Sequence, residues 1–298
     1  MKYHIPALLK ESIEGLNIQP DGVYVDLTFG GGGHSAEILR ILDKGRLIAF
    51  DQDESAERNR PADDRFLFFN QNFRFLRNVL RYAGVDSVDG LIADLGVSFH
   101  QFDKPDRGFS FRYNTPLDMR MNKNSKRIAS EVIKSYSFDD LKRILSEYGE
   151  LKNAGRIARI IEDARIESPI VTAGDLVKVL EGIVPAKGEN KFYAKVFQAL
   201  RIEVNREIEC LKEMLTQSLE VLKVGGKFVV ITYHSLEDRV VKNFFRAGNF
   251  DGIEQKDFYG NLIVPLRQVN RHVIVPSEEE IKGNSRARSA KLRIAERI

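Results

Sequence analysis

The stretch that decides the fold is residues 22–39, which read GVYVDLTFGGGGHSAEIL. The apolar run at 23–26 has the length and the flanking turn residues of a buried strand. Four glycines at 30–33 follow, and from Ser35 the apolar residues recur at helical spacing. A strand, a glycine-rich turn and a helix are typical of a nucleotide-type loop at the carboxyl edge of a parallel sheet. A glycine run alone also occurs in plain tight turns, so the flanking sequence must decide.

Further strand patterns at 46–50, 66–69, 90–93 and 227–233 alternate with helical ones, which predicts βαβ units. Between residue 104 and about residue 200 no strand pattern occurs. Helices there begin at Ser137 and Thr172, each followed three residues later by Asp, as in a capping box. One long helix is predicted over 202–222, and a glycine turn over 223–226. We therefore predict an α/β core made of residues 1–104 and 201–298, interrupted by an all-helical insertion at 105–200.

Composition excludes several classes of protein. The 298 residues include no apolar run near the length of about 18 that spans a bilayer. The start, MKYHIPALLKE, lacks the apolar segment of a signal peptide. A single cysteine, Cys210, excludes an internal disulfide and a cysteine-based zinc site, and the five histidines show no i, i+4 ligand pair. We expect a cytoplasmic protein with no membrane contact and no metal.

The net charge of +3 is unevenly distributed along the chain. Residues 107–200 hold 17 Lys and Arg against 12 Asp and Glu, whereas the rest holds 29 against 31. The densest basic stretch, 104–127, also contains Phe109, Phe111 and Tyr113. Basic side chains among aromatic ones suit an RNA backbone with splayed bases. A solvated loop is the alternative interpretation.

Three aspartates follow predicted strands. Asp51 lies about 20 residues after the glycines, where a carboxylate can accept the hydroxyls of a ribose. Asp26, four residues before Gly30, would repel a pyrophosphate but suits a ligand with an α-ammonium group. This favours S-adenosylmethionine over a nicotinamide dinucleotide. Asp94 would face both the cofactor and the acceptor, unless it only caps a turn.

Several longer motifs carry a resemblance to a known family: residues 22–39, DGLIADLGVS at 89–98, RGFSF at 107–111, PLDMRMN at 116–122, FQALRIEVNREI at 197–208 and HSLEDRVVK at 234–242. Across essentially its whole length the chain resembles the bacterial 16S rRNA (cytosine-N(4))-methyltransferase family, the MraW or RsmH type. The resemblance implies a Rossmann-like class I methyltransferase sheet that uses S-adenosylmethionine. The cofactor contacts that it implies are Gly32, Gly33, His34, Asp51, Phe73, Asp94 and Gln101.

Two of these contacts have ordinary alternatives, since His34 can be a helix-start residue and Phe73 a core residue. The chain also departs from the family pattern at 192–196, where FYAKV replaces a run like HPATR, although Tyr193 and Lys195 could still contact RNA. The implied substrate is a cytidine in the decoding centre of 16S rRNA, in the small subunit or a late precursor. The implied enzyme is a monomer or a homodimer.

The chemistry of an exocyclic amine narrows the catalytic candidates. The nitrogen must lose a proton as it attacks a methyl group, so a fixed hydrogen-bond acceptor is needed, and Asp94 is the candidate. His234 and Ser235 could position the base, or could only start a helix. Methylation at ring carbon 5 needs a nucleophilic cysteine, and Cys210 lies within a predicted helix among apolar residues. A nicotinamide oxidoreductase and an RNA-binding assembly factor with a vestigial pocket remain as rival functions.

Overall fold

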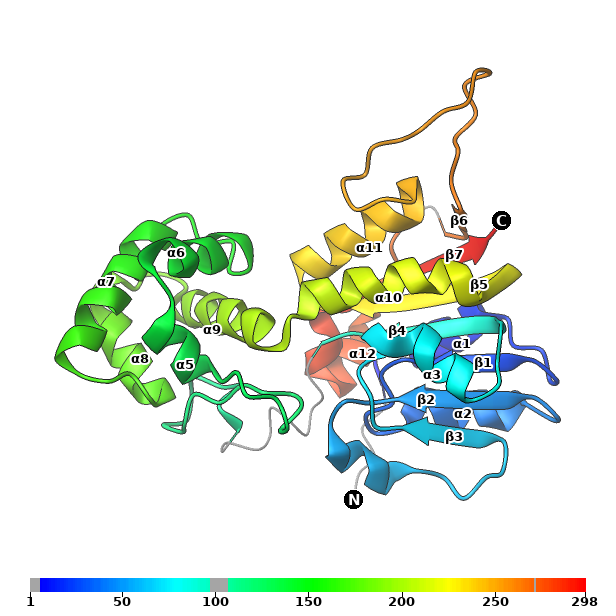
Figure 1. The fold of residues 1–298 in the computed structure, drawn as a ribbon, viewed down its shortest axis with the longest axis horizontal. Helices are drawn as coiled ribbons and strands as arrows, with labels where there is room; N and C mark the ends of the chain where they lie inside the picture. Colours follow the sequence, from blue (N-terminus) through cyan, green and yellow to red (C-terminus); the bar gives the residue numbers. More distant parts are fainter. Residues whose placement is uncertain (1–5, 97–106, 271) are drawn as a thin grey trace. The chain divides into compact units, whose positions relative to one another are not determined.

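The computed structural model describes residues 6–96, 107–270 and 272–298 (Figure 1). The chain forms two compact units: a sheet unit, Met1–Gly96 with Ile208–Ile298, and a helical unit, Val97–Glu207. The sequence had placed the corresponding divisions at 104–105 and 200–201. In the structure the first division falls between Gly96 and Val97, two residues after Asp94. The helical unit therefore begins in sequence directly after the strand that Asp94 ends.

The sheet unit contains seven strands in the order β3-β2-β1-β4-β5-β7-β6. Their bounds are Val23–Asp26 (β1), Arg46–Phe50 (β2), Phe66–Phe69 (β3), Val88–Asp94 (β4), Leu222–Thr232 (β5), Leu266–Gln268 (β6) and Lys291–Arg297 (β7). The first five strands in this order are parallel, whereas β7 is antiparallel to both β5 and β6. The predicted Rossmann-like α/β fold is confirmed, and β6 and β7 add an antiparallel edge that the sequence analysis missed.

Helices cover both faces of this sheet (Figure 1). They are α1 (Leu9–Leu16), α2 (Gly33–Ile41), α3 (Leu76–Tyr82), α10 (Glu207–Val221), α11 (Ser235–Ala247) and α12 (Glu278–Gly283), with 3-10 turns η1 (Glu54–Asn59), η2 (Phe73–Phe75) and η5 (Ser285–Ser289). Successive strand residues point to opposite faces, so Tyr24 packs in one apolar cluster and Val25 in the other. No helix among the described residues is long and apolar enough to cross a membrane.

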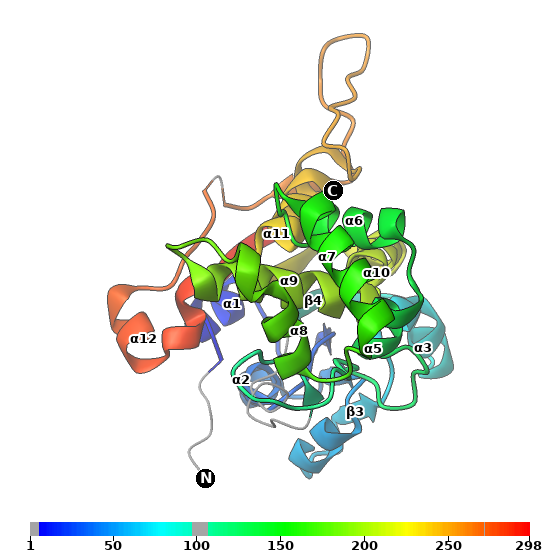
Figure 2. The same cartoon turned by 90° about the vertical axis from the view of Figure 1, so that its left-hand side faces the viewer.

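The helical unit comprises α5 (Ala129–Ser135), α6 (Phe138–Glu147), α7 (Ala154–Glu167), α8 (Ala173–Leu180), η4 (Glu181–Ile183) and α9 (Glu189–Asn205) around one apolar core (Figure 2). Its described part, 107–207, contains no strand. The predicted caps are present. Thr172 forms a full capping box with Asp175, while Ser137 accepts the backbone N–H of Asp140 at 3.1 Å.

The predicted helix over 202–222 is wrong, because the chain breaks at Arg206, whose φ is 52°. Asn205 explains the break: its side chain accepts the N–H of Met121 and donates to the carbonyl of Met119. These tertiary bonds fix the end of α9, and α10 begins anew at Glu207. The predicted turn at 223–226 is a bulge within β5, between the pairs Val88–Leu222 and Gly90–Lys227.

Candidate functional site

The glycine loop leaves β1 at the carboxyl edge of the sheet and leads directly into α2. Gly30 and Gly32 have φ of 50° and 78°, a region that side chains with a Cβ avoid. A Cβ added to Gly32 would lie 3.0 Å from the Phe29 ring, whereas one added to Gly31 would meet nothing within 4 Å. The loop therefore leaves open space at Gly31, as a ligand cradle requires, whereas Gly33 packs closely on Pro6, since an added Cβ there would lie 2.3 Å from the proline ring.

Asp26 lies beneath this loop rather than on its surface. Its carboxylate accepts the Thr28 N–H at 3.0 Å and the Ser35 hydroxyl at 2.7 Å, and the residue is only 2% exposed. Burial raises the pKa of Asp26 to about 6, against the lowering effect of these two hydrogen bonds. The predicted contact of Asp26 with the cofactor would thus act through the field of its carboxylate and through the shape that it gives the loop.

Asp51 joins the second strand to the same loop. One carboxylate oxygen accepts the Gly30 N–H at 2.8 Å, and the other accepts the Asp53 N–H at 2.8 Å. Each oxygen keeps a lone pair for a ligand hydroxyl, which is what a ribose contact needs. Burial raises the pKa of Asp51 to about 6, and the carboxylates of Asp53 and Asp26 add to this shift.

His34, in the first turn of α2, is 5% exposed. Burial lowers its pKa to about 4, with the backbone of Ala7 acting in the opposite direction, so the ring is neutral at pH 7. Its Nε2 has no hydrogen-bond partner among the described residues. Its Nδ1 lies 4.0 Å from Oδ2 of Asp94, which is too far for a hydrogen bond. A buried nitrogen without such a partner is compatible with the predicted contact of His34 with the cofactor, which stays a prediction.

Asp94, at the end of β4, is held at two points. Its backbone N–H donates to Oγ1 of Thr28 at 2.7 Å, and its Oδ1 accepts the phenolic O–H of Tyr233 at 2.8 Å. Burial raises the pKa of Asp94 to about 7; the Tyr233 bond lowers it, and the carboxylates of Asp26 and Glu237 raise it. The carboxyl group therefore titrates near neutrality, as a proton acceptor at pH 7 requires. Tyr233 was not among the predicted site residues.

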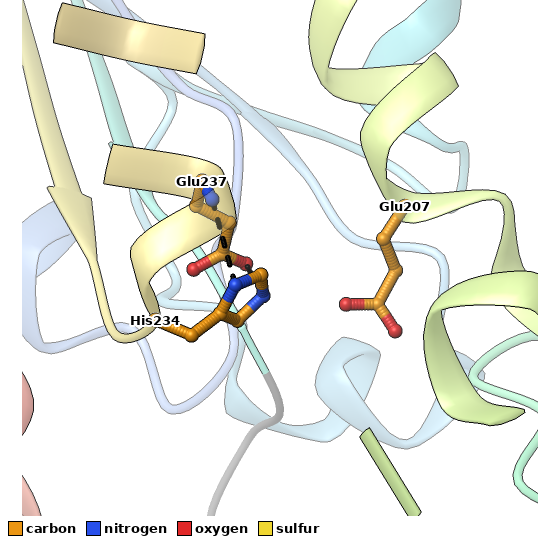
Figure 3. A group of neighbouring side chains, drawn as sticks. All are labelled: Glu207, His234 and Glu237. Atoms are coloured by element: carbon orange, nitrogen blue, oxygen red, sulfur yellow. Dashed lines mark hydrogen bonds and ion pairs between the residues drawn. The ribbon is translucent and has the colours of Figure 1, made fainter. Parts of the chain in front are cut away.

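The segment 234–238 follows this tyrosine in sequence and begins α11, and its residues His234 and Glu237 are drawn in Figure 3. Nδ1 of His234 accepts the Glu237 N–H at 3.4 Å, and its Nε2 lies 3.1 Å from Oε1 of Glu237, although the angle is not that of a hydrogen bond. His234 is thus the cap of its own helix, and Ser235 is an exposed first-turn residue. Glu207, also drawn in Figure 3, is the last residue of the helical unit and accepts two bonds from Arg201.

Comparison with known proteins now defines the family. The sequence matches the MraW methylase family over residues 1–298. The chain belongs to this family of methylases. The relative named ribosomal RNA small subunit methyltransferase H from Flavobacterium johnsoniae is 55% identical over 100% of this chain and 99% of its own length. The protein of that name from Parabacteroides distasonis is 54% identical over 99% and 98%. The resemblance stated from the motifs is confirmed, and with it S-adenosylmethionine as the cofactor.

The site of this MraW-family methylase fits a cationic ligand that carries a ribose. Three carboxyl groups with raised pKa values, those of Asp26, Asp51 and Asp94, surround the loop. A positive charge among them would favour their ionised forms. Phe73 begins η2 and packs partly buried against the sheet core, so its predicted contact with the adenine remains a prediction. Gln101 lies outside the described residues.

Only some side chains of the basic stretch in the helical unit are exposed to solvent. Phe109 is buried, so its predicted stacking role is wrong, and Phe111 is partly buried against Tyr193 and Phe197, which disfavours the same role for it. Tyr193 is likewise a core residue at 2% exposure, and Lys195 donates to a backbone carbonyl. These rings are apolar surface that the small helical core needs. Within its described part, 107–127, the exposed basic and aromatic side chains are Arg112, Tyr113, Lys123, Lys126 and Arg127.

Arg120 does not belong to that exposed set. Its guanidinium forms a two-point contact with Asp118, at 2.8 and 2.7 Å, and donates to the carbonyls of Lys123 and Ser125. Arg107 is also buried and donates to the carbonyls of Arg120 and Met121. Both arginines therefore hold the loop together, and the sequence could not distinguish them from the exposed ones.

Proposed function

We propose that this methylase modifies the exocyclic N4 amine of one cytidine in the decoding centre, the P-site region, of 16S rRNA. The names of its relatives support small-subunit rRNA as the substrate, and the resemblance of its motifs supports the cytosine amine. The observation that carries the chemistry is the Asp94 carboxyl group. Its pKa is raised to about 7, it lies at the strand end next to the glycine loop, and the described residues engage only one of its two oxygens in a hydrogen bond.

The proposed mechanism uses the chain's residues for binding and for proton transfer. The glycine loop, Asp51 and His34 bind the cofactor, and Asp26 fixes the shape of the loop. When bound, S-adenosylmethionine supplies a methyl group on a positively charged sulfur; the amine nitrogen takes this group in line, and the sulfur keeps the electron pair. Asp94 accepts a hydrogen bond from the amine, which orients the nitrogen and raises its electron density.

The proton that the amine loses goes to the Asp94 carboxylate and from there to solvent. No bond forms between the enzyme and the base, because the amine is itself the nucleophile. Cys210 is buried in α10 within the sheet core, which leaves it no part in a covalent route. We place His234 and Ser235 near the base only as the residues that start α11. His234 accepts the backbone N–H of Glu237, and Glu237 in turn accepts that of Tyr233, so the role that we propose for this segment is to hold the tyrosine rather than to exchange protons.

The helical unit is the proposed RNA-binding part. Arg112, Lys123 and Lys126 would contact phosphates, and Tyr113 is the one ring of the basic stretch that remains exposed enough to stack on a base. Because the substrate is ribosomal RNA, we also propose that the enzyme acts in the cytoplasm, on the small subunit or a late precursor.

The decisive experiment is mass mapping of methylated cytidines. Unmodified 30S subunits and naked 16S rRNA are each incubated with the enzyme and S-adenosylmethionine, and the RNA is digested and sequenced by mass. We expect one cytidine to gain a methyl group on N4, and Asp94→Asn to abolish the gain while it still binds S-adenosylhomocysteine. Methylation on a ring carbon, or near-normal turnover by Asp94→Asn, would contradict the proposal. RNA binding without any methyl transfer would favour the assembly-factor alternative.

A further inference from the structure

Tyr233 is a tyrosine at the end of one parallel strand bonded to an aspartate at the end of its neighbour. β4 and β5 are parallel and pair with Asp94 opposite Ile231, so the carboxyl ends of both strands lie at the same edge of the sheet. The phenolic O–H donates to Oδ1 of Asp94 at 2.8 Å. The contact joins residues 139 positions apart in the sequence. It lies within the sheet unit, so it does not depend on the helical unit.

The tyrosine itself is held firmly on both sides. Its backbone N–H donates to Oε2 of Glu237 at 3.1 Å, and Glu237 is only 3% exposed. Its ring lies against the turn at Gly96, where an added Cβ would approach the ring to 3.3 Å. A phenol anchored through both backbone and ring has little freedom to leave its acceptor. The orientation of the Asp94 carboxylate is fixed accordingly.

This bond makes the two oxygens of Asp94 unequal. Oδ1 is occupied by the phenol, whereas Oδ2 has the neutral His34 ring 4.0 Å away, beyond hydrogen-bond distance. Among the residues that the structure describes, the other charged groups that act on Asp94 are the carboxylates of Asp26, from β1, and Glu237, from α11. Both are carboxylates with the same negative charge as Asp94, so neither can form a salt bridge with Oδ2. The side chain of Asp94 is 22% exposed, so it is accessible to an incoming donor.

We infer that Tyr233 is a positioning residue for methyl transfer: its phenol holds Oδ1 of Asp94 so that Oδ2 receives the amine of the substrate. The inference rests on the proposed role of Asp94. Since a hydrogen bond donated to the ionised carboxylate favours that form, the phenol also opposes the effect of burial and of the two acidic neighbours. The pKa of Tyr233 is itself raised by burial and by Asp94, so the phenol stays protonated and remains a donor.

The test compares Tyr233→Phe with a matched control, Tyr24→Phe. Both substitutions remove one phenolic oxygen from a tyrosine of the sheet unit and keep the ring. Tyr24 accepts the N–H of Gln19 at 2.7 Å, near the start of β1 and away from the carboxyl edge. The readouts are kcat and KM for methyl transfer to 30S subunits across pH, binding of S-adenosylhomocysteine, and the thermal midpoint.

For Tyr233→Phe we expect kcat at neutral pH to fall at least about fivefold, and the acidic limb of its pH profile to rise by about one pH unit. KM for S-adenosylmethionine and binding of S-adenosylhomocysteine should stay near their wild-type values. Tyr24→Phe should leave the acidic limb of the kcat profile at its wild-type pH, even if the thermal midpoint changes. A merely structural role of Tyr233 would lower activity equally at every pH.

An unchanged limb and an unchanged kcat in Tyr233→Phe would overturn the inference. A loss of the same size at every pH would overturn it as well. Failure of the underlying proposal has a different signature, because Asp94→Asn would then keep its activity. An inactive Asp94→Asn together with a normal Tyr233→Phe would leave the proposed role of Asp94 standing and remove only the role of the phenol.

Discussion

Replacing Asp94 with asparagine should remove methyl transfer and, at alkaline pH, stabilise the folded protein. The side chain is a carboxyl group whose burial raises its pKa to about 7, compared with 3.8 in the unfolded chain. Above pH 7 the folded state must carry this charge in a poorly solvated place. Asparagine has nearly the same shape and still accepts the hydrogen bond from Tyr233, but it carries no charge. Its benefit should therefore grow with pH.

The size of the effect follows from proton linkage. An acid whose folded pKa exceeds its unfolded pKa binds more protons when folded, so stability falls as pH rises between the two values. Between about pH 5.5 and about pH 8.5 the folded carboxyl group ionises, whereas the unfolded one is already ionised throughout. The ionisation costs about 1.5 units times 1.36 kcal/mol, or about 2 kcal/mol. Relative to wild type, Asp94→Asn should gain that amount across this range.

The assay is denaturant unfolding followed by far-ultraviolet circular dichroism, since the chain has no tryptophan. Asp238→Asn is the control, because the pKa of Asp238 is shifted in the opposite direction to that of Asp94. The Asp238 pKa is lowered, although its burial acts the other way, because Arg293 and Lys291 on β7 bond to it at 2.7 and 3.3 Å. Loss of the Asp238 charge should therefore destabilise the folded protein, and by nearly the same amount at about pH 5.5 as at about pH 8.5. If the difference between Asp94→Asn and wild type did not vary with pH, the carboxyl group would have an ordinary pKa and the reasoning would fail.

Three further outcomes are expected. Gly32→Ala should destabilise the loop by about 1–2 kcal/mol and weaken S-adenosylhomocysteine binding in calorimetry, because its φ is 78°; Gly31→Ala, with open space around it, should cost stability much less. Asp51→Asn should cost about 1–3 kcal/mol in thermal unfolding, because its amide leaves one of two backbone N–H groups without an acceptor. Neutralising Arg112, Lys123 and Lys126 together should lower the slope of log affinity for RNA against log salt by about 2; an unchanged slope would exclude this surface as the RNA contact.

The parts of the fold that depend on local sequence could be predicted. The bounds of β1, β2 and β3 agree with the predicted ranges, because each is a short apolar run between turn residues. The break at Arg206 could not be predicted, since the helical period continues on both sides and only the contacts of Asn205 with residues 119 and 121 end the helix. β6 was missed because it has only three residues, and β7, which has seven, was missed because charged residues interrupt its apolar ones in the run KLRIAER.

In the site, too, the features that depend on local sequence could be predicted and those that depend on tertiary contacts could not. The glycine loop, Asp51 and Asp94 follow from strand ends and turn chemistry, whereas the bond between Asp94 and Tyr233 depends on which strands become neighbours. The sequence already ended a strand at position 233, so a search for polar groups at adjacent strand ends would have found this tyrosine. The exposure of aromatic side chains could not be predicted either: Phe111 and Tyr113 look alike in sequence, yet Phe111 packs partly buried against the helical core and Tyr113 is exposed to solvent.

The order in which the strands are made has a consequence for synthesis. β4 and β5 are neighbours in the sheet, but the entire helical unit is translated between them, and β7, which pairs with both β5 and β6, comes later still. As the chain leaves the ribosome, the helical unit has all its residues while the sheet still lacks three strands. β4 must therefore wait with one edge unpaired. A pause or a truncation after the helical unit would expose an aggregation-prone edge, whereas the same event before β1 is complete would not.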